Sequence, residues 1–273
     1  MNRRPVTVLG ASGFIGRHLV ARLRADGIAF DAPPRQDADL LRRPLGHVIY
    51  AIGLTSDFRS RPLDTVEAHV CLLRSLLAHG DFDSLTYLSS TRVYSGLNDT
   101  RESATLRVNP NDASDLYNLS KLMGESLCLH GGRPAKVARL SNIVGLRDAP
   151  DSFIDQLLEE GARDGRITLR TALSSRKDYL HIDDAVSQIL AIALSDATGI
   201  FNVAHGAGVE NREVAANLQD ALGYPVSVAP DAPEWAFDDI DVTRTQALCR
   251  RPPQPFSEFF PNFLAQYRLH KGI

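Results

Sequence analysis

The sequence predicts an α/β protein in which helices cover both faces of a doubly wound parallel sheet. Strand-like and helix-like patterns alternate from Val6 to about Asn142, which is typical of parallel strands joined by helices. A strand, a glycine-rich turn and a helix open the chain, and two later apolar runs end in small residues. With 273 residues and 44% hydrophobic content, the chain can form one large unit with a modest appendage.

The first strand and its turn predict a site for a dinucleotide. Val6–Leu9 is rich in β-branched residues, and an apolar side chain recurs every four positions in the helix pattern after the turn. Gly16 falls on that helix, where only a hydrogen atom lets the helix approach the strand. The N–H groups of the turn and the positive end of the helix dipole would bind a pyrophosphate. The predicted contacts are Gly10, Ser12, Gly13, Phe14, Ile15 and Gly16.

Two further apolar runs, at residues 47–53 and 84–90, predict buried strands of the same sheet. In a doubly wound sheet the ligand lies across the carboxyl ends of the strands. Ala51, Ile52 and Gly53 end the first run and are further predicted cofactor contacts. Ser90 ends the second run and is placed to meet the ligand, although an ordinary turn hydroxyl is the alternative interpretation.

Tyr117 and Lys121 stand four residues apart in a helix pattern that covers residues 113–129. This spacing sets a phenol and an ammonium group on one helical face, where they can act as a proton donor and its activator. The chain has 7 tyrosines but only 4 lysines against 26 arginines. Chance alone would produce the spacing about 0.1 times, so the pair gains its weight from the other motifs.

After Asn142 the alternation changes. A helix is expected at residues 152–161, and the chain should return to the sheet near residues 179–204, with a last strand at 199–204. Another helix is expected at 211–222, and residues 256–267 are rich in aromatic side chains.

Together these motifs make the chain resemble the extended short-chain dehydrogenases/reductases of the NAD-dependent epimerase/dehydratase type. Residues 139–145 look like that family's strand leading to a substrate-contacting asparagine, and residues 176–184 are similar to its arginine-aspartate-aromatic-x-histidine segment. The resemblance implies a Rossmann-type domain at residues 1–149 plus 178–204. It also implies a small discontinuous substrate lobe at residues 150–177 plus 205–273.

The resemblance implies a catalytic set of Ser90, Tyr117 and Lys121. Lys121 would bond the ribose of the cofactor and favour the ionised form of Tyr117, which passes a proton to or from a substrate oxygen. Ser90 would donate a hydrogen bond to that oxygen. The expected substrate contacts are Thr91, Asn142, Arg176 and Lys177.

The expected function is an NAD(P)-dependent oxidoreductase or epimerase at a hydroxyl or keto carbon of a sugar, with a nucleotide sugar favoured. Thr91 and Arg92 stand where sugar 4,6-dehydratases carry an acidic pair, so dehydration is not expected. Residues 231–241 contain five carboxylates and no base, which disfavours a diphosphate there. A non-nucleotide carbonyl or polyol substrate, or a non-catalytic NAD(P)-binding regulatory protein, remains an alternative.

The phosphate preference of the cofactor is expected to be set near residue 35. An acidic residue at the end of the second strand grips the adenosine ribose, whereas a nearby arginine accommodates a 2′-phosphate. Asp31 comes too early if the strand runs to Ala32, and Arg35 stands at the phosphate position, so the sequence leans to NADP. Asp39 and Leu40 are expected to line the adenine pocket by resemblance.

Composition excludes several other classes. The net charge of −3 gives no electrostatic case for nucleic acid. No apolar run of membrane-spanning length occurs. Three unclustered cysteines suit a reducing cytoplasm, and no metal motif, nucleophile elbow or Walker loop is present.

The resemblance also implies a homodimer through the helices at residues 65–79 and 113–129. Leu72, Leu73, Leu76 and Leu77 offer more apolar surface than one packed face needs, with burial inside one chain as the alternative.

Overall fold

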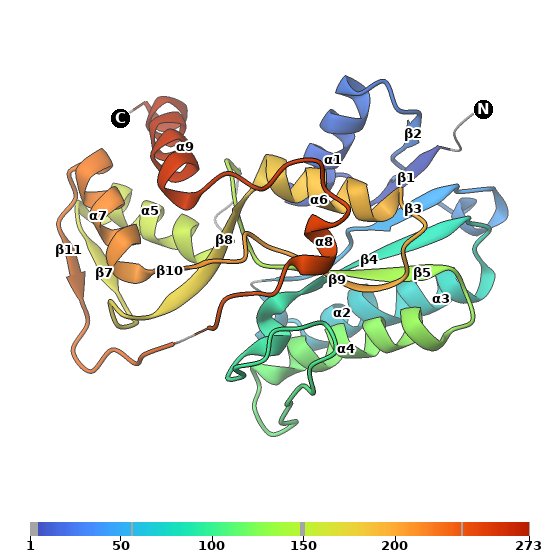
Figure 1. Cartoon of the computed structure of the whole chain (residues 1–273), viewed down its shortest axis with the longest axis horizontal. Coiled ribbons are helices and arrows are strands. Elements are labelled where there is room, and N and C mark those ends of the chain that lie inside the picture. The colour runs from blue at the N-terminus through green and yellow to red at the C-terminus, as the bar shows by residue number, and fades with distance from the viewer. Residues whose placement is uncertain (1–4, 56, 148–150, 236, 273) are drawn as a thin grey trace.

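The computed structural model describes residues 5–55, 57–147, 151–235 and 237–272, and a six-stranded parallel sheet forms its centre (Figure 1). The strand order is β2-β1-β3-β4-β5-β9, so the winding direction reverses beside β1 and the predicted doubly wound sheet is confirmed. The strands are β1 (Val6–Leu9), β2 (Phe30–Asp31), β3 (His47–Tyr50), β4 (Ser84–Ser90), β5 (Ala135–Leu140) and β9 (Gly199–Val203).

Helices cover both faces of this sheet. α1 (Phe14–Ala25) and α6 (Ile182–Ala193) lie on one face, and α3 (Leu72–His79) and α4 (Asp115–His130) lie on the other (Figure 1). Leu19 and Leu23 of α1 are fully buried against the sheet, as their spacing predicted. The apolar faces of these helices therefore form one hydrophobic layer on each side of the sheet.

The helix expected at residues 65–79 is one helical stretch with a wider turn inside it. α2 (Pro62–Val66) is joined to α3 by a π-helical turn, η3 (Glu67–Cys71). The Tyr50 hydroxyl donates to the carbonyl of Ala68 at 2.7 Å, and the Tyr87 hydroxyl donates to that of His69 at 3.3 Å. Two buried tyrosines on β3 and β4 thus satisfy the carbonyls of a turn type that is frequent at functional sites.

A second sheet, of three strands, begins directly after β5 of the central sheet. It contains β6 (Asn142–Val144), β8 (Arg176–His181) and β10 (Gly208–Glu210) in the order β10-β8-β6. The expected return to the central sheet within residues 179–204 is made by β9, close to the predicted last strand, whereas β8 pairs with β6 and β10.

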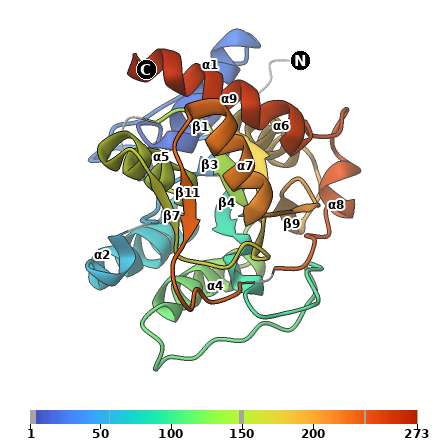
Figure 2. The same ribbon diagram turned by 90° about the vertical axis from the view of Figure 1, so that its left-hand side faces the viewer.

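The C-terminal lobe, defined here by α5, β7, α7, β11 and α9, has its own aromatic core (Figures 1 and 2). Its elements are α5 (Phe153–Asp164), β7 (Ile167–Leu169), α7 (Asn211–Leu222), β11 (Val226–Val228) and α9 (Phe256–Lys271). Ser152 and Asp155 form a capping box at the start of α5. Phe256 and Phe260 of α9 stack with ring centroids 4.4 Å apart, so the aromatic run in the sequence fills this core.

Short helical segments complete the chain: η1 (Leu40–Arg42), η2 (Asp57–Arg59), η4 (Thr91–Tyr94) and α8 (Thr243–Gln246). Within the described ranges, no helix combines the length and hydropathy that crossing a bilayer requires.

Candidate active site

A cleft of about 590 Å³ runs along the carboxyl ends of β1, β3, β4 and β5, and residues of the C-terminal lobe and of the segment before α8 line its other side. Eight of the predicted cofactor contacts line it: Gly13, Phe14, Ile15, Ala51, Ile52, Gly53, Tyr117 and Lys121. The cleft therefore lies at the carboxyl ends of the strands, where a doubly wound sheet is expected to bind its ligand.

The glycine turn is held tightly against the sheet. Gly10 has a φ of 83°, and a Cβ there would lie 2.7 Å from the Ala51 carbonyl oxygen. A Cβ on Gly16 would lie 2.1 Å from the carbonyl oxygen of Gly10, which no side chain could tolerate. Neither residue lines the cleft, so these glycines shape the turn and do not contact a ligand through a side chain.

The start of α1 fits a pyrophosphate. The first N–H groups of a helix have no partner within the helix. Gly13 is the N-cap and offers no side chain to accept from them, and the first turn contains no acidic residue. An anion at this point would meet free donors and the positive end of the helix dipole.

Tyr117 and Lys121 lie on the buried face of α4, with Lys121 Nζ 5.8 Å from the centroid of the Tyr117 ring. Burial raises the pKa of Tyr117, while a hydrogen bond donated by Ser90 and the charge of Arg92 lower it. The backbone N–H of Arg92 donates to Ser90 Oγ at 3.2 Å, which leaves the hydroxyl hydrogen of Ser90 for the phenol. The three residues predicted as catalytic are thus brought together in one wall of the cleft.

The ammonium group of Lys121 is hydrogen-bonded to the central sheet. Nζ donates to the Leu88 carbonyl oxygen at 2.9 Å, the single bond of this group among the described residues. Burial lowers the pKa of Lys121 to about 7, and the carboxylate of Glu125 opposes that shift. Two N–H groups remain for a ligand such as the ribose hydroxyls of a nicotinamide cofactor.

His69 is a buried residue beside the candidate site that the sequence reasoning missed. It lies in η3, fully buried, and its Nε2 accepts from the Leu54 N–H at 3.2 Å. Nδ1 therefore carries the proton and donates to Ser120 Oγ at 2.8 Å, and Ser120 donates in turn to the Tyr117 carbonyl oxygen at 2.8 Å. Burial, followed by the charge of Lys121, lowers the pKa of His69 to about 2, so the ring stays neutral.

This chain of bonds connects the segment after β3 to α4, which carries Tyr117 and Lys121. Leu54 follows directly after Gly53, and a Cβ on Gly53 would lie 3.2 Å from His69 Nε2 and 3.5 Å from Lys121 Nζ. The absence of a side chain on Gly53 therefore leaves room for the His69 ring beside the Leu54 N–H. The lone histidine carried no spacing signal; only the π-helical turn reveals it.

Three of the four predicted substrate contacts line the cleft. Thr91, Asn142 and Lys177 line the cleft, but Arg176 does not, because it pairs with Asp239 at 2.9 Å beside Gly208. Lys177 Nζ lies 3.8 Å from the Phe153 ring centroid. Burial and then repulsion from Arg92 lower the pKa of Lys177 to about 8. Side chains lining the cleft that the sequence did not single out include Phe58, Arg59, Arg92, Phe153, Trp235 and Phe237.

The region where we expect the adenosine of the cofactor differs from the prediction in one respect. β2 ends at Asp31 and does not reach Ala32, so Asp31 stands at the strand end where an acidic residue can grip a ribose. Its carboxylate accepts from Arg43 at 2.8 Å. Arg35, Asp39 and Leu40 are outside the residues that line the cleft, and Arg35 and Asp39 are exposed.

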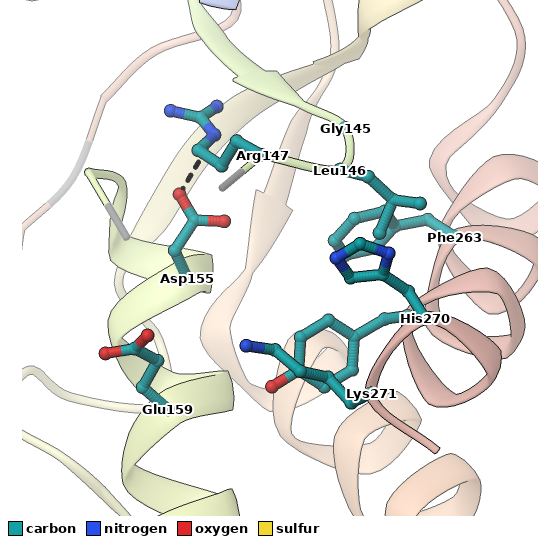
Figure 3. A pocket seen from close by; sticks show the side chains of 9 residues that line it. Gly145, Leu146, Arg147, Asp155, Glu159, Phe263, His270 and Lys271 are labelled. Carbon is teal, nitrogen blue, oxygen red and sulfur yellow. Dashed lines mark ion pairs between the residues drawn. The ribbon is translucent and has the colours of Figure 1, made fainter. Parts of the chain in front are cut away.

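A smaller hollow lies beside the cleft, between the segment after β6 and the end of α9 (Figure 3). Arg147 lines both hollows and pairs with Asp155 at 3.1 Å. The guanidinium carbon of Arg147 lies 3.7 Å from the Phe14 ring centroid, so this ion pair braces the start of α1 against α5. Among the described residues, no three histidine, cysteine or acidic side chains gather as a metal site would require.

Comparison with known proteins gives a consistent result. The sequence model of the NAD dependent epimerase/dehydratase family matches residues 6–204. The chain is 28% identical to a GDP-6-deoxy-D-mannose reductase of Pseudomonas aeruginosa, over 82% of each chain. It is 24% identical to a dTDP-4-dehydro-6-deoxy-D-allose reductase of a Streptomyces species, over 98% of this chain and 97% of that one.

Among solved structures, the UDP-glucose 4-epimerase of Thermus thermophilus in complex with NAD superposes with a TM-score of 0.78 at 21% identity, covering 97% of this chain and 99% of that one. This likeness extends the shared fold beyond residue 204 to nearly the whole chain. The match over residues 6–204, together with the cleft described above, places the chain in the NAD dependent epimerase/dehydratase family, whose members are enzymes.

Proposed function

We propose that this enzyme reduces, oxidises or epimerises a hydroxyl or keto carbon of a nucleotide-linked sugar, using Ser90, Tyr117 and Lys121. The observation that carries the proposal is the buried phenol of Tyr117, with Ser90 bonded to it and Lys121 beside it, in the cleft that starts at the glycine turn. A nicotinamide cofactor bound there would supply or accept the hydride.

The protein's own residues move the proton. Tyr117 would donate it to, or take it from, the substrate oxygen, and Ser90 would hold that oxygen by a hydrogen bond. The charge of Arg92 already favours the ionised phenol. Lys121 would add to this effect when the cofactor's ribose and charge complete the site.

A nucleotide diphosphate carrier is compatible with the charges of the cleft. The five carboxylates between residues 231 and 241 do not line it, whereas Trp235 and Phe237 do. Asp239 is taken up by Arg176 and by the Gly208 N–H. Lys177 is therefore the residue that we assign to the diphosphate, and the names of both curated relatives support a nucleotide-linked substrate.

The carrier is tested by thermal-shift screening of the cofactor-loaded protein with UDP, dTDP, CDP and GDP. Stabilisation by at least one of them supports the proposal, because a ligand that binds only the folded state raises the melting temperature. No response to any of the four, together with turnover of a free polyol or ketone, would favour a non-nucleotide substrate.

For the cofactor we favour NAD over NADP. The lean towards NADP depended on a strand that continued past Asp31, and β2 ends at Asp31. Its carboxylate would accept from the ribose hydroxyls, while a 2′-phosphate would be repelled unless Arg43 or Arg35 turned towards it.

We also propose that two chains associate through α2, α3 and α4. Leu73, Leu76 and Leu77 are buried inside the chain and supply no free surface, but Leu72 is exposed. Leu63, Met123 and Leu129 are further exposed apolar residues on these helices. Sedimentation at micromolar concentration should give twice the chain mass of 29.9 kDa, and a mass near one chain would exclude the dimer.

A further inference from the structure

Two arginines that the proposed mechanism does not need as proton carriers lie beside Tyr117 in the cleft. Arg59 comes from η2 and Arg92 from η4, and both side chains line the cleft. Their guanidinium carbons lie 4.5 Å and 5.3 Å from the centroid of the buried Phe58 ring. Arg92 is also 5.8 Å from the centroid of the Tyr117 ring, so its charge sits at the reacting end of the cleft.

These two charges have no ion-pair partner in the part of the chain that the structure describes. Among the described residues, neither side chain forms an ion pair, and Arg59 donates one hydrogen bond, to Ser114 Oγ at 2.8 Å. The nearby carboxylates are engaged elsewhere: Asp112 accepts from the Ser114 N–H, and Asp115 accepts from the Asn109 N–H and from Asn118. Arg92 is partly buried, and a partly buried cation without an ion-pair partner is unfavourable unless a ligand supplies the anion, whereas Arg59 is exposed.

The electrostatics agree with this geometry. Burial and then repulsion from Arg59 lower the pKa of Arg92, while Tyr117, Asp115 and Asp112 raise it. Burial is the main cause of the lowered pKa of Lys177, and the charge of Arg92 lowers it further. Two carboxylates line the cleft among the described residues, Asp151 and Asp178. Asp178 is buried and accepts from the N–H groups of His205 and Gly206.

We propose that Arg92 and Arg59 bind an acidic group carried by the sugar ring itself, so that the substrate is a sugar acid whose carboxylate lies next to the carbon facing Tyr117. This proposal rests on the proposed function and narrows its substrate class. A guanidinium group is planar and can hold a carboxylate by two parallel hydrogen bonds, which suits this position.

The diphosphate carrier is the other anion that could reach the cleft, and the structure favours Lys177 for it. Lys177 stands on β8 and packs against Phe153 of α5, whereas Arg59 and Arg92 pack against Phe58. A ring carboxylate at Arg92 and a diphosphate at Lys177 would hold the sugar at two points, with the reacting carbon held at the phenol.

The test measures, by calorimetry, the affinity of the NAD-loaded protein for UDP, UDP-glucose and UDP-glucuronic acid, and for GDP, GDP-mannose and GDP-mannuronic acid. With the base that the protein accepts, the sugar acid should bind at least about tenfold more tightly than the neutral sugar. Arg92→Gln should lower the affinity for the acid by about 10- to 100-fold and leave that for the neutral sugar within about twofold.

Arg59→Gln should cause the same selective loss, and it provides a second variant if Arg92→Gln does not fold. Arg107→Gln removes an equal charge from an exposed position outside the cleft and should change none of the affinities. Equal affinity of the wild type for acid and neutral sugar would overturn the subsite and leave the proposed function standing.

A loss in Arg92→Gln that is the same for nucleotide, neutral sugar and acid would assign Arg92 to the diphosphate, and would also overturn the subsite. Binding of none of the six ligands would contradict both the subsite and the proposed function.

Discussion

The two ends of the cofactor region are built differently. At the end that we propose as catalytic, Lys121 bonds to the sheet, and His69 links Leu54 to the helix through Ser120, all within the buried interior. At the adenosine end, Arg35 is exposed, and Asp39 pairs with Arg42 while their side chains remain 70% and 79% exposed. Exposed ion pairs contribute about 0–1 kcal/mol, whereas an unsatisfied buried group costs about 1–3 kcal/mol.

This difference predicts where substitutions matter. A change at the catalytic end should disturb chemistry and stability strongly, because Lys121 and His69 there are bonded to fixed buried partners. A change at the adenosine end should alter the choice between cofactors and little else. Effects of similar size from substitutions at both ends would contradict this difference.

The largest effect is expected from Tyr117→Phe, which removes the proton donor and keeps the ring. Turnover should fall by about 10²–10⁴-fold, the usual contribution of general acid–base catalysis. The dissociation constant of the cofactor, measured by fluorescence titration, should stay within about twofold, because the ring packing is retained.

Tyr224→Phe is the matched control, since it removes the same atom from a residue of the C-terminal lobe that does not line the cleft. A loss of turnover below about tenfold in Tyr117→Phe would remove this phenol from the mechanism.

The next effect concerns His69 as a positioning residue. His69→Ala should lower the free energy of unfolding by about 2–4 kcal/mol, because the Leu54 N–H loses its acceptor and a buried cavity forms. Cofactor affinity should fall as well, since the segment after β3 loses its anchor. Urea unfolding and cofactor titration measure the two effects.

His69→Gln can accept from Leu54 and donate to Ser120, so it should restore much of the cofactor affinity. His79→Ala, in an exposed position at the end of α3, is the control. Equal cofactor affinity in His69→Ala and wild type would show that this histidine only fills space.

A smaller effect is expected from pH. The folded pKa of Lys121 is about 7, below the ordinary value of 10.5. Between these two values the unfolded chain binds the proton and the folded chain does not, so Lys121 makes the cofactor-free protein more stable as the pH rises. The gain should reach about 2 kcal/mol between pH 7 and pH 9.

Urea unfolding of the wild type and of Lys121→Met at both pH values isolates this contribution as the difference between the two proteins. The same pH dependence in both would assign the effect to other groups, and a fall in the wild type relative to Lys121→Met would contradict the lowered pKa.

The smallest effect is expected at the adenosine end. Arg35→Ala should change the ratio of NADP to NAD affinity by less than about tenfold, because the exposed arginine has no fixed geometry. Asp31→Asn should weaken NAD more than NADP by removing the ribose acceptor. If titration shows NADP bound more tightly than NAD, and Arg35→Ala reverses this order, Arg35 selects the cofactor after all.

The sequence predicted that Tyr117 and Lys121 lie in the cleft beside the glycine turn because the signals for this arrangement are local. The glycines close to β1 in the chain and the four-residue spacing of Tyr117 and Lys121 on one helix specify geometry through short-range backbone rules. His69 escaped prediction because its role depends on a π-helical turn and on a contact with Ser120, which is 51 residues away. The end of β2 was misplaced by one residue, since strand boundaries depend on pairing with β1 and not on local preference.

Arg176 is a second residue whose position the sequence alone did not predict. Its position before Lys177 suggested a phosphate contact, but neighbouring residues of a strand point to opposite faces. Lys177 therefore reaches the cleft while Arg176 turns to Asp239. Which of the two faces the ligand depends on the pairing of β8 with β6 and β10, which the sequence alone did not indicate.

The most direct test of the role of Tyr117 is the absorbance of the bound nicotinamide at the wavelength of its reduced form. Wild type and Tyr117→Phe, loaded with NAD or NADH, are mixed with UDP-, dTDP- and GDP-linked hexoses, their acids and their 4-keto forms. We expect a single-turnover change in the wild type with at least one of these sugars and a change at least about 100-fold slower in Tyr117→Phe. Tight cofactor binding without any absorbance change in the wild type, with this panel and with free polyols and ketones, would contradict a redox role for this cleft.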